Sequence, residues 1–311
     1  MAKHITQRAI DFMGKRRLAL ALSALLILTS LGSLIFQGLK LGLDFTGGTL
    51  VEVGYERPVD LARVRRLLAE NGFEAATVQH FGSAREILIR LPAEPELSSA
   101  DLSNRIMAVL QSDGETRPQL RRVEFVGPQV GEELKEKGGL AMLFALFGIL
   151  IYVAWRFEYR FALGAIAALI HDVIITLGFF SLTRLEFDLT VLAAILAVIG
   201  YSLNDTIVVY DRIRENFRRM RRGGPLEIIN ASINQTLSRT LITSLTTLLV
   251  LLALAFLGGE IIRNFAIALT LGVVVGTYSS VYVASAFLVL LKVKREDLLL
   301  PEKPETDADL L

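Results

Sequence analysis

The 311-residue chain contains no cysteine, which excludes disulfides, thiolate chemistry and cysteine-based metal sites. Its three histidines, at positions 4, 80 and 171, are too widely spaced to suggest a metal site, and there is no glycine-rich phosphate-binding loop. An excess of one charge is also missing, because 33 basic residues balance 32 acidic ones. We therefore expect no metal, no cofactor, no ATP-driven chemistry by this chain and no enzymatic activity.

Long apolar runs are what the chain has in abundance. Its residues are 52% hydrophobic and its mean hydropathy is +0.50, which places it among α-helical polytopic membrane proteins. A spanning helix needs roughly 20 residues, and six runs approach that length: 18–36, 140–155, 161–182, 189–210, 240–257 and 265–291. The first run is longer than a signal-peptide core and no cleavage pattern follows it, so we interpret it as a retained anchor.

Basic residues cluster in four places: before the first run, between the second and third runs (Arg156 and Arg160), after the fourth run and after the sixth. By the positive-inside rule these segments are cytoplasmic. The rule predicts a cytoplasmic N-terminus over residues 1–17 and a cytoplasmic tail over 292–311, which an even number of spans requires. Residues 37–139 then lie on the opposite, extracytoplasmic (periplasmic) side, and residues 140–291 hold spans two to six.

The external segment is long enough for one small domain with its own core. Alternating and helical hydrophobic spacing predicts four strands and two helices, in the order 49–55, 59–71 (helix), 76–81, 86–91, 99–111 (helix) and 120–126, with a turn at 82–84. The order βαββαβ is the ferredoxin-like split motif. Its sheet edges can pair with an extended peptide or dock on a partner domain, and docking is the simpler interpretation.

Asp205 lies in the tail of the fourth run, beside Asn204 and Ser202. A carboxylate at such a depth costs about 2.5–3.5 kcal/mol on insertion scales, so it usually has a partner or a task. The polar neighbours favour a hydrated interior. Ionisable groups in this position are typical of proton-driven transporters.

Arg239 is the candidate partner of Asp205. It lies at the cytoplasmic end of a stripe formed by Thr236, Thr240, Thr243 and Thr247. At about 1.5 Å per residue, Arg239 and Asp205 lie roughly 27 and 24 Å from the outer ends of their spans, so they can meet if the helices are neighbours. A guanidinium favours the charged carboxylate and burial disfavours it, so helix movement can load and release a proton. The alternative for Arg239 is a topology residue that reaches the interface.

His171 and Asp172 fall near the middle of the third run. Adjacent helical residues point about 100° apart, so both cannot face one partner directly. Either Asp172 bonds to a neighbouring helix while His171 faces a wet cavity, or His171 is a neutral buried donor and Asp172 a structural acceptor. We favour the structural role for His171 and leave Asp172 open, as a further candidate for proton relay. Gly272 and Gly276 in the sixth run favour close helix packing.

Four segments carry a family resemblance: 41–49 (LGLDFTGGT), 123–131 (VEFVGPQVG), 200–216 (GYSLNDTIVVYDRIREN) and 235–244 (QTLSRTLITS). They resemble, in turn, the segment after the first span, the segment leading into the second, and the fourth- and fifth-span signatures of the SecD/SecF family of secretion proteins. The resemblance covers nearly the whole chain. The small external segment is similar to the SecF branch rather than to the SecD branch.

The resemblance implies a member of the resistance-nodulation-division superfamily that pairs with SecD and attaches to the SecYEG channel, with the SecA motor and YajC in the larger assembly. Such a unit uses the proton gradient in late translocation of unfolded secreted chains. By this carry-over Asp205 and Arg239 belong to the proton pathway, SecD supplies an opposing carboxylate, and Asp44 with the Gly47-Gly48 turn forms a hinge. Membrane lipid is a further partner, and nucleic acid is not expected.

Two alternatives remain open at this point. One is a proton-coupled small-molecule exporter of the same superfamily, although the large porter domains of such exporters are absent. The other is a non-transporting structural subunit whose buried charges only fix helix packing. In either case six spans are half of the usual unit, so we do not expect this chain to transport alone.

Overall fold

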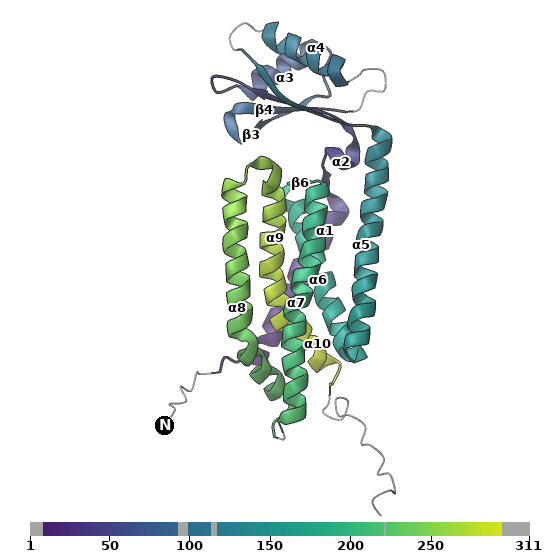
Figure 1. Ribbon diagram of the computed structural model, residues 1–311, viewed down its shortest axis with the longest axis vertical. Helices are drawn as coiled ribbons and strands as arrows, with labels where there is room; N and C mark the ends of the chain where they lie inside the picture. The colour runs from purple at the N-terminus through teal and green to yellow at the C-terminus, as the bar shows by residue number, and fades with distance from the viewer. Residues whose placement is uncertain (1–8, 93–98, 113–116, 221, 294–311) are drawn as a thin grey trace, which may run out of the picture.

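The computed structural model describes residues 9–92, 99–112, 117–220 and 222–293, and the predicted tail beyond residue 293 lies outside them. A long bundle of helices carries a small α/β head at one end (Figure 1). The head consists of a sheet that faces the bundle and two helices on the far side of that sheet.

Six helical segments among the described residues are long and apolar enough to cross a membrane, which confirms the polytopic prediction. They are α1 (Arg16–Phe36, preceded by the 3₁₀ turn Met13–Lys15), α5 (Pro128–Arg156), α6 (Tyr159–Thr183), α7 (Leu189–Arg219), α8 (Pro225–Leu257) and α9 (Glu260–Ser279). The last segment continues through a π-helical turn, Ser280–Ala284, into α10 (Ser285–Leu290).

Several helices extend well beyond the apolar runs that predicted them. Helix α5 begins at Pro128 instead of residue 140, α7 continues to Arg219 instead of 210, and α8 begins at Pro225 instead of 240. Hydropathy marks the apolar part of a helix and misses its charged turns, such as the one closed by the 2.5 Å Lys137–Glu133 ion pair. The head therefore ends near Val126 and not at residue 139, which corrects the predicted boundary.

The head follows the order β-α-β-β-α-β, with β2 (Gly48–Gly54), α3 (Leu61–Glu70), β3 (Thr77–Phe81), β4 (Ser83–Leu91), α4 (Ser99–Ser112) and β5 (Gln119–Val126). Its sheet is antiparallel, with the strand order β3-β4-β2-β5. Val51, Val53, Ile87 and Ile89 alternate along the two central strands and are buried with residues of α3 and α4. The predicted three-residue turn is shorter, because Gly82, at φ +70°, makes it and Ser83 already belongs to β4.

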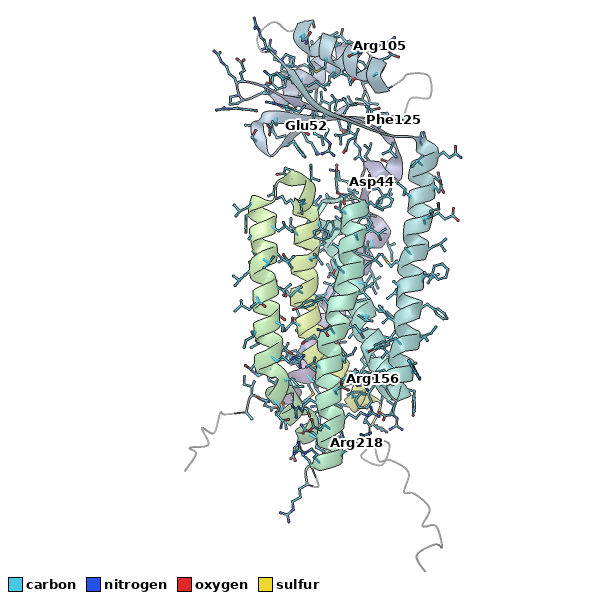
Figure 2. The ribbon with its side chains drawn as sticks, in the orientation of Figure 1. Asp44, Glu52, Arg105, Phe125, Arg156 and Arg218 are labelled. Atoms are coloured by element: carbon cyan, nitrogen blue, oxygen red, sulfur yellow. The ribbon has the colours of Figure 1, made fainter. Side chains whose placement is uncertain are left out.

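Two small elements that the sequence did not reveal connect the head to the bundle. Strand β1 (Lys40–Leu41) leaves α1 and pairs in parallel with β6 (Glu186–Phe187), which immediately precedes α7. The short helix α2 (Leu43–Thr46) follows and leads into β2. Asp44 of α2 lies at this junction (Figure 2), where its Oδ2 accepts a 2.9 Å hydrogen bond from the backbone N–H of Leu189.

Helix α7 lies at the centre of the bundle and packs against α6, α8 and α9. Close approach to α9 depends on small residues, because a Cβ on Gly272 would overlap the side chain of Val198 and one on Gly276 would reach Ser202 at 3.0 Å. Only a small part of the apolar stretches of α5 and α8 is buried by the rest of the chain. Large apolar side chains such as Trp155 and Phe256 are left exposed on them, as expected of surfaces that meet lipid or another protein.

Candidate functional site

Asp205 is buried in α7, with 7% of its surface exposed. Thr240 of α8 donates a 2.7 Å hydrogen bond from its hydroxyl to Oδ1 of Asp205. The second oxygen, Oδ2, is buried and no donor meets it in good hydrogen-bond geometry within the described part of the chain, although the hydroxyl of Ser280 lies near the carboxyl group. A buried carboxylate oxygen without a donor is costly, so this group has unused capacity to hold a proton or a further donor.

Arg239 lies next to Thr240 in α8 but does not contact Asp205. Its side chain is exposed and lines a groove of about 430 Å³ between α7 and α8, together with Asn204, Asp211 and Gln235. Within the ranges that the structure describes, Arg239 makes no ion pair. The sequence therefore placed the two helices together at the correct depth, but Thr240 and not Arg239 supplies the direct contact, since one residue turns a helix by about 100°.

Asp172 joins three helices. Its Oδ2 accepts hydrogen bonds from Ser202 of α7, at 2.5 Å, and from Ser279 of α9, at 2.7 Å. Its Oδ1 lies 2.8 Å from Nδ1 of His171, the preceding residue in α6. A bond from Asp172 to a neighbouring helix was one of the two alternatives left open by the sequence. A direct bond between His171 and Asp172 was not expected.

His171 does not face a wet cavity, contrary to one of the sequence-based alternatives. Only 2% of it is exposed, and its Nε2 lies 3.1 Å from the hydroxyl of Ser23 in α1. Ser23 in turn lies 3.0 Å from the hydroxyl of Tyr278. Serine within an apolar run gives no signal in a hydropathy reading, and for that reason Ser23 was missed.

The two carboxylates lie in one band of polar side chains across the bundle. Ser202 and Asp205 are one turn apart on α7. On the opposite side, Ser279 bonds to Asp172, while Ser280 lies 3.0 Å from the hydroxyl of Thr206. The π-helical turn begins at Ser280, and such turns are frequent at functional sites. The sequence pointed to Ser202 through its position beside Asp205, but nothing in it singled out Ser279 or Ser280 as partners of the carboxylates.

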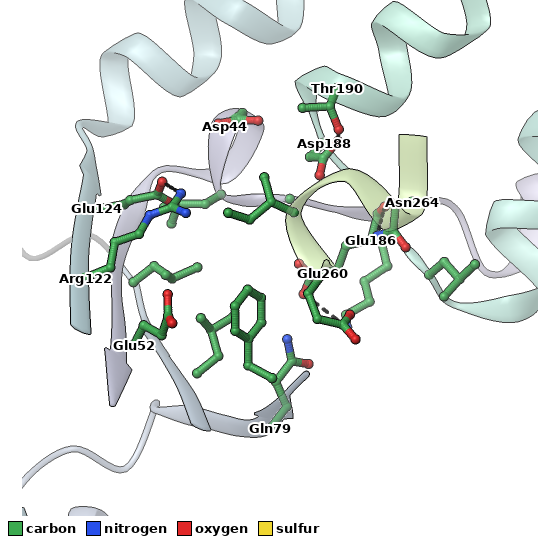
Figure 3. A pocket seen from close by; sticks show the side chains of 18 of the residues that line it. Asp44, Glu52, Gln79, Arg122, Glu124, Glu186, Asp188, Thr190, Glu260 and Asn264 are labelled. Atoms are coloured by element: carbon green, nitrogen blue, oxygen red, sulfur yellow. Dashed lines mark hydrogen bonds and ion pairs between the residues drawn. The ribbon is translucent and has the colours of Figure 1, made fainter. Parts of the chain in front are cut away.

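A second polar region separates the head from the bundle (Figure 3). It is a cavity of about 400 Å³ whose walls are the uncovered face of the sheet, including Glu52, Gln79 and Glu124, and the end of the bundle, including Glu186 and Glu260. Arg122 and Glu124 form an ion pair within it. The broad open face of the sheet is therefore turned toward the bundle.

Six apolar helices around buried, hydrogen-bonded carboxylates define a polytopic membrane protein with an ionisable interior. Family models match the chain over residues 106–294, described as "Protein export membrane protein SecD/SecF, C-terminal", and over residues 32–59, described as "SecD/SecF GG Motif". The chain belongs to the SecD/SecF family.

Similar proteins cover nearly the full length of the chain. The protein translocase subunit SecF of Vibrio alginolyticus is 52% identical over 303 residues, covering 97% of this chain and 96% of that protein. The corresponding protein of Pseudomonas aeruginosa is 52% identical over 301 residues, covering 96% and 97%. The matched relatives support a multi-pass membrane protein of a bacterial family engaged in protein export.

A solved structure shares the fold. The crystal structure of SecDF from Thermus thermophilus, described as a translocon-associated membrane protein, matches with a TM-score of 0.84 at 43% identity. The match covers 93% of this chain but 39% of the SecDF chain, so this chain spans well under half of that polypeptide. A second SecDF structure, in a super-membrane-facing form, matches with a TM-score of 0.70 at 42% identity.

Proposed function

We propose that this chain is a membrane subunit of the Sec export machinery that pairs with a SecD-type protein. The pair uses the proton-motive force to promote late translocation of unfolded secreted chains across the cytoplasmic membrane. The match to part of a longer SecDF polypeptide supports this pairing, because the remainder of that polypeptide has no counterpart here. SecYEG, SecA and YajC complete the proposed assembly, and the subunit itself is not an enzyme.

The proposed topology places both termini in the cytoplasm and the head outside. Basic side chains at the end of the bundle remote from the head support this orientation, among them Arg156 and Arg218 (Figure 2). The strand order and helix positions of the head support a ferredoxin-like domain between the first and second spans.

The observation that carries the proposal is the position of Asp205. Its carboxyl group is buried at the contact between α7 and α8, with one oxygen bonded to Thr240 and the other met by no donor in good hydrogen-bond geometry among the described residues. The groove lined by Arg239 opens beside it, on the part of α7 that leads to the proposed cytoplasmic end. Moving one charge through 100 mV is worth about 2.3 kcal/mol, comparable to the energy of a modest conformational change.

The test uses the complex with its SecD-type partner in inverted vesicles, with and without a proton gradient. We expect Asp205→Asn to reduce export to the level seen without a gradient while leaving assembly intact. Glu227→Gln is the matched control, because Glu227 is an exposed carboxylate in the first turn of α8 and does not line the groove. Full gradient-dependent export by the Asp205 variant would contradict the proposed role.

Proton flux separates this proposal from the two alternatives. A structural subunit predicts no flux through the purified complex in either the native form or the Asp205 variant. A small-molecule exporter predicts flux that is stimulated by a drug-like substrate and is indifferent to the SecYEG channel. Flux that rises when a secreted chain is being translocated supports the export role.

A further inference from the structure

When each hydroxyl hydrogen is given to a single acceptor, the hydrogen bonds between α1, α6 and α9 have one consistent set of directions. The hydroxyl of Tyr278 donates its single hydrogen to the carbonyl oxygen of Ala19, at 2.7 Å. The 3.0 Å contact between Ser23 and Tyr278 must then use the hydrogen of Ser23. With that hydrogen committed, Ser23 can only accept at its 3.1 Å contact with Nε2 of His171. Nε2 of His171 therefore carries a hydrogen.

The same reasoning fixes the proton content of the neighbouring contact. Nδ1 of His171 and Oδ1 of Asp172 are 2.8 Å apart, and one hydrogen must lie between them. Oδ2 of Asp172 already accepts from the hydroxyl of Ser202, and it is the nearer of two acceptors for the hydroxyl of Ser279, at 2.7 Å against 3.1 Å for the carbonyl oxygen of Gly276. Whether the hydrogen is written on the ring or on the carboxyl group, the pair has no net charge and holds one proton more than a neutral histidine beside a carboxylate.

The surroundings of the pair favour this neutral state. Helices α1, α7 and α9 hydrogen-bond to the pair, and the π-turn after α9, which carries the titratable Tyr282, also packs against α6. Tyr278 stacks on the ring of His171 at 6.1 Å between centroids, and Asp205 lies one turn beyond Ser202 on α7. None of these groups is a cation, so a negative charge left on the pair would have no counter-ion among the described residues in a desolvated site.

We propose that His171 and Asp172 form a second proton-binding site, which holds one shared proton while α1 remains in contact with α6. When that proton leaves, His171 keeps its Nδ1 hydrogen, Asp172 becomes a carboxylate, and Nε2 becomes an acceptor. Ser23 then faces Nε2 with a hydrogen that is already given to Tyr278, so the contact is lost unless Ser23 turns away from Tyr278. Proton release is thereby linked to movement of α1 or of the π-turn end of α9.

This inference deepens the proposed function by adding a proton-binding group beside Asp205, but its test does not depend on export. The probe is ¹⁵N-histidine NMR of the full chain with its SecD-type partner in lipid nanodiscs, without any gradient. The chain has three histidines, so His4→Gln and His80→Gln identify the His171 signals. We expect a directly bonded hydrogen on Nε2 of His171 in the native chain at pH 6 and at pH 8. A ring with hydrogen on Nδ1 alone at pH 6 overturns the proposal.

A variant that leaves both members of the pair in place sharpens the test. Tyr278→Phe removes the acceptor of the Ser23 hydroxyl and frees its hydrogen for Nε2. We expect the Nε2–H signal of His171 to disappear at pH 8 in this variant. Ser33→Ala is the matched control, because it removes another buried α1–α6 hydrogen bond, the 2.7 Å contact with Ser181, without touching the pair.

Both variants report on the proposal even if export fails in each. Loss of the Nε2–H signal in Tyr278→Phe and its retention in Ser33→Ala support the shared proton. Retention in both, or loss in both, contradicts the assigned hydrogen-bond directions. If Asp205→Asn leaves export intact, the proposed function fails, yet these spectra still decide the state of His171 and Asp172.

Discussion

Thr240 of α8 donates its hydroxyl hydrogen to Oδ1 of Asp205 of α7 across 2.7 Å, and both side chains are buried. Thr240 belongs to the row of threonines along α8, and through it that row bonds directly to the carboxyl group of α7. It fixes the relative height and rotation of the two helices at the proposed proton site.

We expect Thr240→Val to destabilise the protein by about 1–3 kcal/mol, because it leaves a buried carboxyl oxygen without a donor. Gradient-dependent export should fall with it, whereas Thr240→Ser keeps the hydroxyl and should retain both. Thermal unfolding in detergent and vesicle export measure the two effects. Thr247→Val is the control, because its hydroxyl bonds to the carbonyl of Thr243 in its own helix. Equal losses of stability and export in Thr240→Val and Thr247→Val would show that the bond to Asp205 has no special role.

Gly272→Ala should loosen the contact between α9 and α7. Its new methyl group would overlap the side chain of Val198, and overpacking of this kind costs about 1–3 kcal/mol. The double variant Gly272→Ala with Val198→Ala should recover part of the loss, as measured by thermal unfolding. Gly200→Ala lies on α7 with open space around it and should be neutral or slightly stabilising. A tolerated single variant would show that the two helices are not held at this distance.

Gly48→Ala should disrupt the start of β2. Gly48 has φ +129°, and a Cβ there would overlap the carbonyl oxygen of Leu91, a backbone atom that cannot turn aside. We expect a cost of about 1–3 kcal/mol from backbone strain alone and faster proteolysis of the head. Gly38→Ala also has positive φ, at +63°, but meets nothing within 4 Å, so it should be milder. Indistinguishable digestion of the two variants would refute the steric argument.

The N-terminal segment should detach from α8 when two asparagines are changed together. Asn230 accepts from the backbone N–H of Phe12 at 2.8 Å, and Asn234 accepts from that of Ile10 at 2.9 Å. Each lost hydrogen bond is worth about 1 kcal/mol, which corresponds to a factor of about five in an equilibrium. Hydrogen exchange at each of these two amides should therefore be about fivefold faster in the double variant Asn230→Ala with Asn234→Ala. Asn264→Ala, at the other end of the bundle, is the control and should leave both amides protected.

The apolar runs predicted the number of spans correctly, yet they missed where several helices begin. Glu132, Glu133 and Glu136 interrupt the hydropathy of α5, although its helix continues through them to Pro128. Polar residues such as Asn230 and Gln235 hid the first turns of α8 in the same way. Hydropathy responds to the environment of side chains, whereas helix length is decided by backbone hydrogen bonds, which continue into water.

The sequence predicted the level of Asp205 and Arg239 along the bundle, but it did not predict which face of α8 points toward α7. Counting residues brought Asp205 to the level of Arg239, but the hydrogen bond is made by the next residue, Thr240. The network around His171 depends on Ser23 and Tyr278, which lie 255 positions apart in the chain. A single sequence holds no record of which helices are neighbours, so contacts of this kind emerge only from the packed bundle.

The short pairing of β1 with β6 has a mechanical consequence. Gly42, beside β1, donates a 2.8 Å backbone hydrogen bond to the carbonyl of Phe187, and Asp44 holds the first amide of α7. The root of the head and the start of α7 are thus fastened to each other, and α7 runs as one uninterrupted helix from there through Asp205. The anchor of the head and the carboxyl group of Asp205 thus belong to one continuous rod, so the height of the head above the bundle and the height of Asp205 within it are set by the same helix.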